Sequence, residues 1–215
     1  MIAFFTPLIM AGTLKYFYES IGTQFRYALF QSVSALTGTG FSTVDFIPWN
    51  HMGLYLITLL MIFGGDLDST SGGLKQYRLF ALGKLLWMEI KMYFLPKNAL
   101  LKEEIWKGET KRYLDHSLVK EILLIFSLYF ITFAVGVGIT ASYGHSLAFS
   151  AFEFASALST VGLSVGITLP SSPAGLIWTE TVGMFLGRLE FLVVIYAITK
   201  LLRDGKVMLA KRRND

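Results

Sequence analysis

The sequence has no cysteine and few charges, and both shortages narrow the class of protein. Without cysteine, the 215 residues form no disulfide scaffold, no cysteine-ligated metal centre and no thiol active site. Charged residues make up 16%, against about 25% in an ordinary soluble domain. Because 53% of the residues are hydrophobic and the mean hydropathy is +0.55, the composition argues against a soluble protein and indicates a membrane protein of a few spans.

Two long apolar runs in the second half predict membrane-spanning helices. The run 122–141 carries no charge and, at about 1.5 Å per residue, is long enough for a hydrocarbon core of about 30 Å. The run 174–202 contains four ionisable residues, Glu180, Arg188, Glu190 and Lys200. Ionisable residues inside a span usually face a cavity or a partner, so Glu180 and Glu190 could draw cations toward a pore or bind a structural partner in the bundle.

The first half contains a shorter pair of apolar runs. Ile2–Leu14 predicts a span with Lys15 at the membrane interface rather than a signal peptide, because no basic residue precedes it. Gly53–Phe63 begins a further span, which the segment Gly64–Gly73 interrupts with four glycines and two aspartates. A lipid-facing helix does not continue through such a sequence, so we expect a broken helix that resumes at Leu74.

Lys and Arg are distributed very unevenly along the chain. Sixteen of the nineteen lie in two segments, 75–120 and 200–213. By the positive-inside rule both segments are cytoplasmic, which predicts a multi-pass protein of the cytoplasmic membrane, surrounded by lipid, with both termini in the cytoplasm. The net charge of +4 then reflects topology and does not predict a nucleic-acid partner, because the basic tail directly follows a span.

An internal repeat divides the chain into two units. The segments Phe30–Ser42 and Phe152–Ser164 match at a constant offset of 122 residues. The same offset pairs Gly22 with Gly144, Pro48 with Pro170, Gly53 with Gly175, Phe63 with Phe185 and Gly65 with Gly187. Glycines and prolines that keep register over such a length indicate two copies of one unit. Each copy contains two crossings, so the copies are parallel in the membrane and not inverted.

The repeat predicts both the fold class and the division of the chain. We expect an all-α membrane protein with two parallel repeats, each made of a span, a pore helix and a second span, as in potassium channels. The first repeat would cover 1–95 and the second 121–203. Between them, 96–120 would be an amphipathic cytoplasmic connector, and 204–215 would be a basic cytoplasmic tail.

Each repeat has a short segment between its spans. Phe25–Leu36 and Leu147–Leu158 are too short to cross a membrane, so we expect re-entrant helices that enter from the outer face. The polar stretches that follow, Thr37–Ser42 and Ser159–Ser164, should line a pore, because non-helical backbone at membrane depth is tolerated only where it is buried in protein or faces water. Their carbonyls can replace the hydration shell of a potassium ion, and glycine permits the dihedral angles required.

These polar stretches resemble a known family. Thr160-Val161-Gly162-Leu163 is similar to the Thr-Val-Gly-Tyr opening of potassium-channel filters, and Gly38-Thr39-Gly40-Phe41 is its degenerate counterpart. With the strings FGGDLDSTSGGLK (63–75) and GRLE (187–190), they resemble the Trk/Ktr/HKT superfamily of potassium transporters. Members of that family carry four span–pore–span units in one chain, and this sequence resembles the third and fourth.

The resemblance implies roles for particular residues and for partners. The filter would consist of Gly38, Thr39, Gly40, Phe41, Thr160, Val161, Gly162 and Leu163, which would bind potassium through backbone carbonyls. A gate below it would consist of Gly64, Gly65, Asp66, Asp68, Ser69, Thr70, Gly72, Gly73 and Arg188. Asp66 and Asp68 depart from the small or neutral residues usual in the family. The other half of the ring would come from a second copy or a companion chain, and a cytoplasmic nucleotide-binding regulatory subunit would dock on the connector and tail.

Three functions are open at this point. The first is potassium uptake through a carbonyl-lined filter gated by an intramembrane loop, without a cofactor and without enzyme activity. The second is a non-conducting regulatory fragment, and the third is an intramembrane aspartyl enzyme in which Asp66 and Asp68 share a proton. The offset of 122 also places Asp66 opposite Arg188, which predicts an ion pair between them.

Overall fold

The chain folds into helices and one short hairpin. The computed structural model describes residues 1–65, 69, 71–95, 104–107, 110–113, 116–188, 191, 193–194, 196–197 and 199–204. The first part contains α1 (Ile2–Gly12), a 3-10 turn (Leu14–Tyr16), α2 (Ile21–Thr37), α3 (His51–Ile62) and α4 (Gln76–Phe94). The second contains β1 (Glu104–Lys107), β2 (Thr110–Tyr113), α5 (His116–Ser142), α6 (Leu147–Leu158) and α7 (Ala174–Arg188). The predicted all-α class is confirmed.

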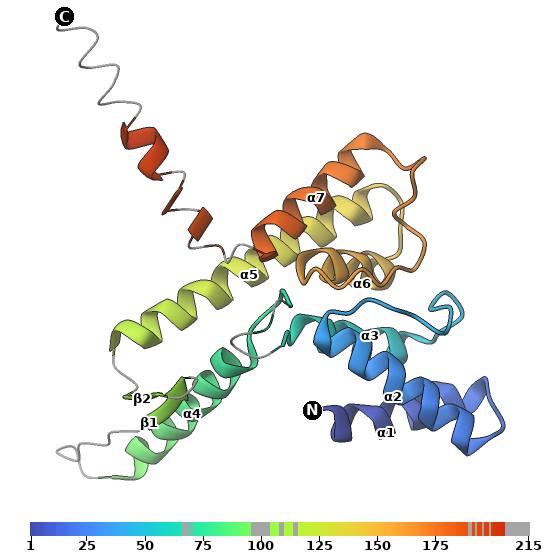
Figure 1. Ribbon diagram of the computed structural model, residues 1–215, viewed down its shortest axis with the longest axis horizontal. Coiled ribbons are helices and arrows are strands. Elements are labelled where there is room, and N and C mark those ends of the chain that lie inside the picture. The colour runs from blue at the N-terminus through green and yellow to red at the C-terminus, as the bar shows by residue number, and fades with distance from the viewer. Residues whose placement is uncertain are drawn as a thin grey trace, which may run out of the picture.

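The two repeats fold alike and lie side by side (Figure 1). Helices α1, α2 and α3 form the first, and α5, α6 and α7 form the second. Helix α6 begins and ends where the sequence predicts, whereas α2 begins at Ile21, four residues before the predicted start. The repeats meet where α3 packs against α6, and the main apolar core lies between them. Each polar stretch therefore follows a helix, and α6 is buried along most of its length whereas α2 is buried on one side.

The lengths of the helices differ from those of the predicted spans. Among the described helices, Ser117–Ser142 is long and apolar enough to cross a membrane by itself. Ile2–Tyr16, His51–Ile62 and Leu147–Leu158 are apolar but shorter. Helix α7 spans Ala174–Arg188, and the described residues beyond it, 191, 193–194, 196–197 and 199–204, are also helical. Glu190, one of the predicted intramembrane carboxylates, lies outside the described residues.

Asn50 connects the end of α1 to the start of α3. Its Oδ1 accepts hydrogen bonds from the Gly53 amide at 2.9 Å and from the Thr13 hydroxyl at 2.8 Å. Its Nδ2 donates to the Gly12 carbonyl at 2.6 Å. A side-chain acceptor at the N-cap satisfies a backbone amide that has no partner within the helix. One residue thus fixes the angle at which the chain enters α3 after the first polar stretch.

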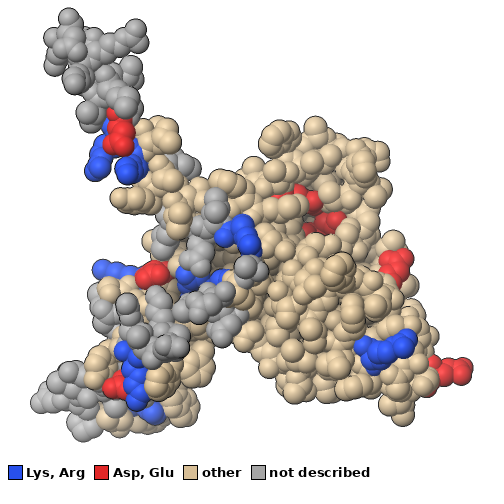
Figure 2. All heavy atoms as spheres, in the orientation of Figure 1, with Lys and Arg blue, Asp and Glu red and all other residues tan. Residues whose placement is uncertain are grey.

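The connector contains a hairpin that the sequence did not predict. Strands β1 and β2 are antiparallel, with Glu104 opposite Tyr113 and Ile105 opposite Arg112. Ile105 is 1% exposed because it packs in a second apolar cluster formed by residues of α4 and α5, namely Tyr77, Ala81, Leu118 and Ile122. On the face drawn in Figure 2, Lys and Arg gather around α4 and the hairpin, and most of the surface over the two repeats is uncharged.

Candidate functional site

The two polar stretches adopt the same unusual backbone. Gly38 and Gly40 have φ angles of +72° and +76°, and their counterparts at the repeat offset, Thr160 and Gly162, have +54° and +93°. Thr160 is the one non-glycine residue with positive φ in the described part of the chain. Successive carbonyls of an extended strand point to opposite sides, and a left-handed residue at every second position turns them toward the same side. This geometry suits a row of carbonyls that faces one axis.

Each stretch is anchored to the last turn of its short helix. The Thr39 amide donates to the Ser34 carbonyl at 3.1 Å, and at the equivalent positions the Val161 amide donates to the Ser156 carbonyl at 2.9 Å. The hydroxyls of these serines differ in role. Ser34 donates to the Phe41 carbonyl at 2.6 Å, whereas Ser156 accepts from the Gly162 amide at 3.0 Å.

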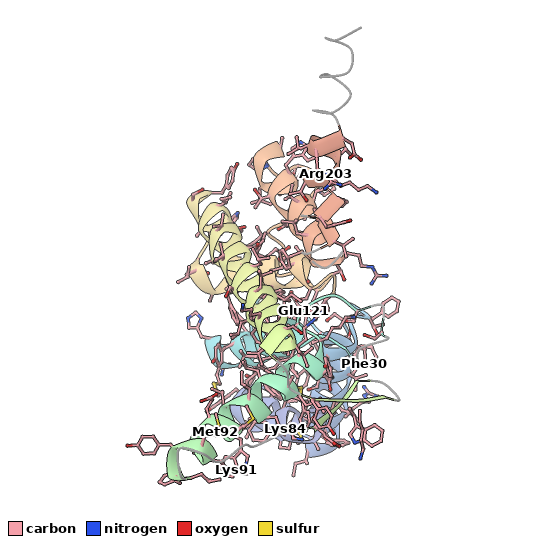
Figure 3. The ribbon with its side chains drawn as sticks, turned by 90° about the vertical axis from the view of Figure 1, so that its left-hand side faces the viewer. Phe30, Lys84, Lys91, Met92, Glu121 and Arg203 are labelled. Atoms are coloured by element: carbon pink, nitrogen blue, oxygen red, sulfur yellow. The ribbon has the colours of Figure 1, made fainter. Side chains whose placement is uncertain are left out.

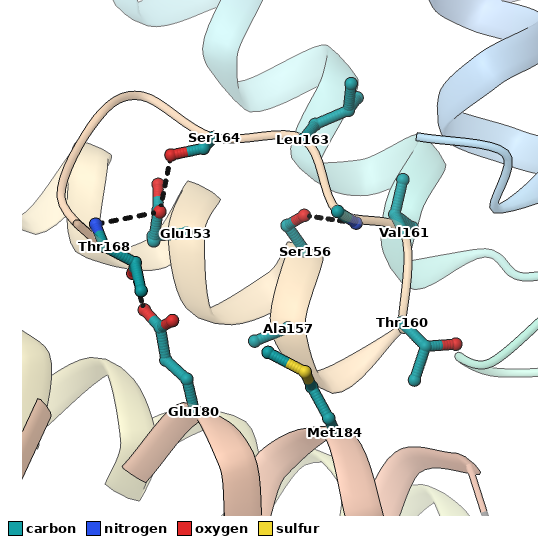
Figure 4. A pocket seen from close by; sticks show the side chains of 11 residues that line it. Glu153, Ser156, Ala157, Thr160, Val161, Leu163, Ser164, Thr168, Glu180 and Met184 are labelled. Atoms are coloured by element: carbon teal, nitrogen blue, oxygen red, sulfur yellow. Dashed lines mark hydrogen bonds between the residues drawn. The ribbon is translucent and has the colours of Figure 1, made fainter. Parts of the chain in front are cut away.

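A polar side chain one turn earlier on each helix holds the chain beyond the filter. In the first repeat Gln31 donates to the hydroxyls of Ser42 and Thr43. In the second, Glu153 occupies the equivalent position and accepts three hydrogen bonds from residues 164–168, of which those from Ser164 and Thr168 are drawn in Figure 4. Reasoning from the sequence assigned neither residue a role, although the offset of 122 pairs them and could have found them.

The two filter stretches contact each other directly. A Cβ added to Gly40 would lie 1.9 Å from the Val161 carbonyl oxygen, so this position has no space for a side chain. Just beyond the first stretch, the rings of Phe46 and Phe152 are in contact, with centroids 5.0 Å apart. The structure therefore brings the predicted filter residues of the two repeats together.

The predicted gating loop lies against the N-terminal ends of both polar stretches. A Cβ on Gly72 would lie 2.5 Å from the Ser159 carbonyl oxygen, and a Cβ on Gly38 would lie 2.7 Å from the Ser71 hydroxyl. The loop also folds on itself, since a Cβ on Gly64 would lie 2.0 Å from the Gly72 carbonyl oxygen. Of the other predicted gate residues, Gly65, Ser69 and Gly73 are in the described part of the loop, and Asp66, Asp68 and Thr70 lie outside it.

Lys75 holds the loop from its C-terminal end. Its ammonium group donates to the carbonyls of Ser69 and Ser71, each at 2.7 Å. The Lys75 side chain is 7% exposed, so these charge-assisted bonds are shielded from water. Lys75 ends the motif FGGDLDSTSGGLK, but its bonds to the loop carbonyls are not predictable from the sequence. The positions of those carbonyls depend on tertiary structure.

Arg188 shares a cavity with the loop and with both filter stretches. The cavity has a volume of about 650 Å³ and is lined by Thr37, Gly38, Ser71, Thr160, Met184, Phe185 and Arg188. Arg188 is exposed to this space at the end of α7. Next to it, a Cβ on Gly187 would lie 1.7 Å from the Leu158 carbonyl oxygen, so glycine allows α7 to approach the end of α6. The predicted pair of Arg188 with Asp66 falls outside the described residues.

A second cavity of about 340 Å³ lies beside the second filter stretch (Figure 4). It is lined by Thr160 to Ser164 together with Glu153, Ser156, Ala157, Thr168, Glu180 and Met184. Glu180 is buried, and its Oε1 accepts a hydrogen bond of 2.5 Å from the Thr168 hydroxyl. Within the described residues, no group of three or more His, Asp and Glu side chains could hold a metal ion.

Comparisons with known proteins agree with this geometry. The family model described as TrkH, cation transport protein, matches residues 5–212. The chain is 31% identical over 168 residues to an uncharacterized cation transporter of Methanocaldococcus jannaschii, covering 78% of this chain and 35% of the relative. It is 31% identical over 171 residues to the Ktr system potassium uptake protein D of Bacillus subtilis, covering 80% of this chain and 35% of the relative.

A solved structure has the same fold. The crystal structure of the potassium transporter TrkH from Vibrio parahaemolyticus superposes with a TM-score of 0.73 at 25% sequence identity. The match covers 91% of this chain and 42% of that one. The chain therefore spans less than half the length of these proteins, and its fold is that of an all-helical membrane protein.

Proposed function

Because this chain belongs to the TrkH family of cation transport proteins, we propose that it supplies two of the repeats of a potassium-uptake pore in the cytoplasmic membrane. The family consists of transporters, so the chain is not an enzyme, and an aspartyl active site at Asp66 and Asp68 is not favoured. The observation that carries the proposal is the pair of adjacent filter stretches with left-handed residues at equivalent positions. In the proposed pore, carbonyls of Gly38–Phe41 and Thr160–Leu163 replace the water around a potassium ion.

The path below the filter leads past the loop Gly64–Gly73. The contacts of Ser71 and Gly72 with both filter stretches support a gate at this place, and the cavity that contains Arg188 lies beside it. A cation in this cavity meets the positive charge of Arg188, which acts as an electrostatic barrier. The membrane potential supplies about 2.3 kcal/mol per elementary charge for each 100 mV, so uptake through a filter and a gate requires no chemical reaction.

The second half of the ring must come from other repeats, and the two ends of this half-ring support that view. Phe152 is 0% exposed because residues of the first repeat cover it, whereas its counterpart Phe30 is 40% exposed (Figure 3). Likewise a Cβ on Gly40 would lie 1.9 Å from the Val161 carbonyl oxygen, whereas a Cβ on Gly162 would meet nothing within 4 Å. A second copy of this chain, or two further repeats from another source, would cover both Phe30 and Gly162.

The arrangement of charge supports the proposed topology. In Figure 1 the hairpin, α4 and the first turns of α5 lie at the left, and the connections on either side of α6 lie at the right. Figure 2 shows most of the Lys and Arg residues of that face toward the left, and Figure 3, which looks from the left-hand side, labels Lys84 and Lys91 on α4 and Arg203 beyond α7. Basic residues therefore gather at one end of the helices, which is the cytoplasmic end by the positive-inside rule. A regulatory nucleotide-binding subunit would dock there, on α4 and the hairpin.

Rubidium uptake in a host that lacks potassium uptake tests the proposal. One strain expresses this chain alone, which tests a ring of two copies. A second expresses a chimera in which the chain replaces the 171 matching residues of the Bacillus subtilis relative. We expect uptake in at least one strain, with the empty host and the relative lacking those residues as controls. Absence of uptake from both strains, with the protein present in the membrane, would overturn the pore and favour a non-conducting fragment.

A further inference from the structure

We propose that Glu153 is a positioning residue that determines the ion selectivity of the second filter stretch, an inference that rests on the proposed pore. Its carboxylate makes three hydrogen bonds to the chain beyond the filter. Oε1 accepts from the Ser164 hydroxyl at 2.7 Å and from the Thr168 amide at 3.2 Å. Oε2 accepts from the Val165 amide at 2.9 Å. The side chain is 4% exposed, so these bonds form away from bulk water.

The bonds reach the filter because anchored residues lie on both sides of Leu163. Ser164 directly follows Leu163, and Glu153 holds it from α6. One turn later on the same helix, Ser156 holds the Gly162 amide through its hydroxyl and the Val161 amide through its carbonyl. One face of α6 therefore holds residues 161 and 162 of the filter and residues 164 and 165 directly after it, and removal of Glu153 would release the second pair. Selectivity between monovalent ions depends on how firmly such carbonyls are held.

The first repeat holds its filter with the opposite hydrogen-bond polarity. Gln31, the counterpart of Glu153, donates through Nε2 to the hydroxyls of Ser42 and Thr43 at 3.2 and 3.1 Å. Its buried Oε1 has no hydrogen-bond partner. In the second repeat a carboxylate, which only accepts, collects two amides and a hydroxyl. In the second repeat two of the three donors are therefore main-chain amides. Rotation of a loop side chain does not break these two bonds, whereas it can break the bonds that Gln31 makes to hydroxyls.

A purely electrostatic role for Glu153 makes a different prediction. A negative charge near a pore raises the local concentration of every monovalent cation, so its loss would lower uptake of rubidium and sodium by the same factor. A positioning role instead predicts that the ratio of the two changes. Glu153→Gln separates these roles because it removes the charge and converts one acceptor into a donor, which then faces the Val165 amide.

Amide hydrogen exchange of the purified full chain tests the positioning contacts without any transport. We expect the Val165 and Thr168 amides to exchange about tenfold faster in Glu153→Ala, the effect of losing a hydrogen bond to a buried acceptor. In Glu153→Gln we expect faster exchange at Val165 only. Glu180→Gln is the matched control, because Glu180 is also a buried carboxylate beside Thr168 but contacts its hydroxyl, not a filter-loop amide. Unchanged exchange in Glu153→Ala would overturn the proposal.

Uptake then tests the consequence for selectivity, in whichever form of the protein transports rubidium. We expect the ratio of rubidium to sodium uptake to fall about threefold or more in Glu153→Gln, and to return toward the wild-type ratio in Glu153→Asp, which keeps both acceptors. An unchanged ratio with faster amide exchange would overturn the selectivity role and leave the pore standing. A wild-type protein without rubidium uptake would overturn the pore itself, whatever the exchange rates.

Discussion

Thr160 occupies a backbone conformation that its counterpart Gly38 adopts more easily. A left-handed conformation costs a residue with a Cβ about 1–2 kcal/mol. The second repeat nevertheless has this conformation at position 160, where the residue is threonine. The amides on both sides of this position are hydrogen bonded to α6, with the Thr160 amide donating to Ala157 and the Val161 amide to Ser156. These bonds offset the strain, so the carbonyl of Thr160 keeps its orientation although no glycine is present.

Substitution of Gly162 by serine should abolish discrimination between ions. Gly162 has φ of +93°, so a Cβ strains the backbone by about 1–2 kcal/mol, and the hydroxyl projects toward the open side of the filter. We expect rubidium uptake to fall about tenfold and the ratio of rubidium to sodium uptake to fall with it. Gly138→Ser in α5 is the control, because a Cβ there meets nothing within 4 Å in a helix. Full selectivity in Gly162→Ser would contradict the filter assignment.

The sequence predicts glycines of the filter more readily than the side chains that support them. Gly40 and Gly162 are visible because they keep register at the repeat offset and lie in a stretch of small residues. Gln31 and Glu153 keep the same register, but their identities differ, and a helix position facing a loop has no periodic signature. Ser34 and Ser156 are identical in sequence and opposite in hydrogen-bond role, which depends on atomic positions and is not encoded by residue type.

At the scale of elements, the loop Gly64–Gly73 depends on close packing for its position. Gly72 and Gly38 permit contacts with Ser159 and Ser71 that side chains would prevent. Lys75 then supplies the polar component, because its ammonium group replaces water at two loop carbonyls. The described part of the loop is thus positioned by glycine contacts and by the Lys75 hydrogen bonds.

Replacement of Lys75 by methionine should loosen this loop. Methionine keeps the apolar length of the side chain and removes two charge-assisted hydrogen bonds, each worth about 1.5–3 kcal/mol. If the loop closes the pore, we expect rubidium uptake at saturating concentration to rise at least twofold, because the closed position loses stability. Lys120→Met, at an exposed position of α5, should leave uptake unchanged. Unchanged uptake in Lys75→Met would mean that the loop does not limit transport.

The connector shows where element prediction from sequence fails. Its interleaved charges suggest an amphipathic linker, and strands of four residues carry too little periodicity to be recognised. The hairpin forms because Ile105 is buried against residues of α4 and α5 that are distant along the chain. By contrast, α6 begins and ends at the residues that the sequence predicts. In the structure Ser146 caps its start by accepting the Phe149 amide, and the polar stretch begins at its end.

At the scale of the whole molecule, the contact between the two repeats specifies what should cover the exposed ends. Phe46 of the first repeat packs on Phe152 of the second. At the repeat offset of 122, the counterpart of Phe46 is Thr168 and the counterpart of Phe152 is Phe30. Thr168 and Phe30 belong to the two opposite ends of the half-ring. A ring closed by two copies of this chain would therefore bring Phe30 of one copy against Thr168 of the other, and Gly162 of one copy against Thr39 of the other.

Crosslinking can test this ring of two copies. Because the sequence contains no cysteine, a thiol reagent reacts with the introduced cysteines and with no native one. Leu169 is next to Thr168 and 51% exposed, so Phe30→Cys combined with Leu169→Cys places two thiols at the expected junction without altering the Thr168 hydrogen bonds. In membranes treated with a short bis-maleimide, we expect covalent dimers of the double variant. Leu124→Cys with Leu169→Cys is the control, because Leu124 is exposed on α5 and does not lie at the expected junction. Monomers from the double variant, together with rubidium uptake by the chimera but not by this chain alone, would instead assign the second half of the ring to other repeats. Phe30 would then be covered by repeats that carry no introduced cysteine, so no covalent dimer would form.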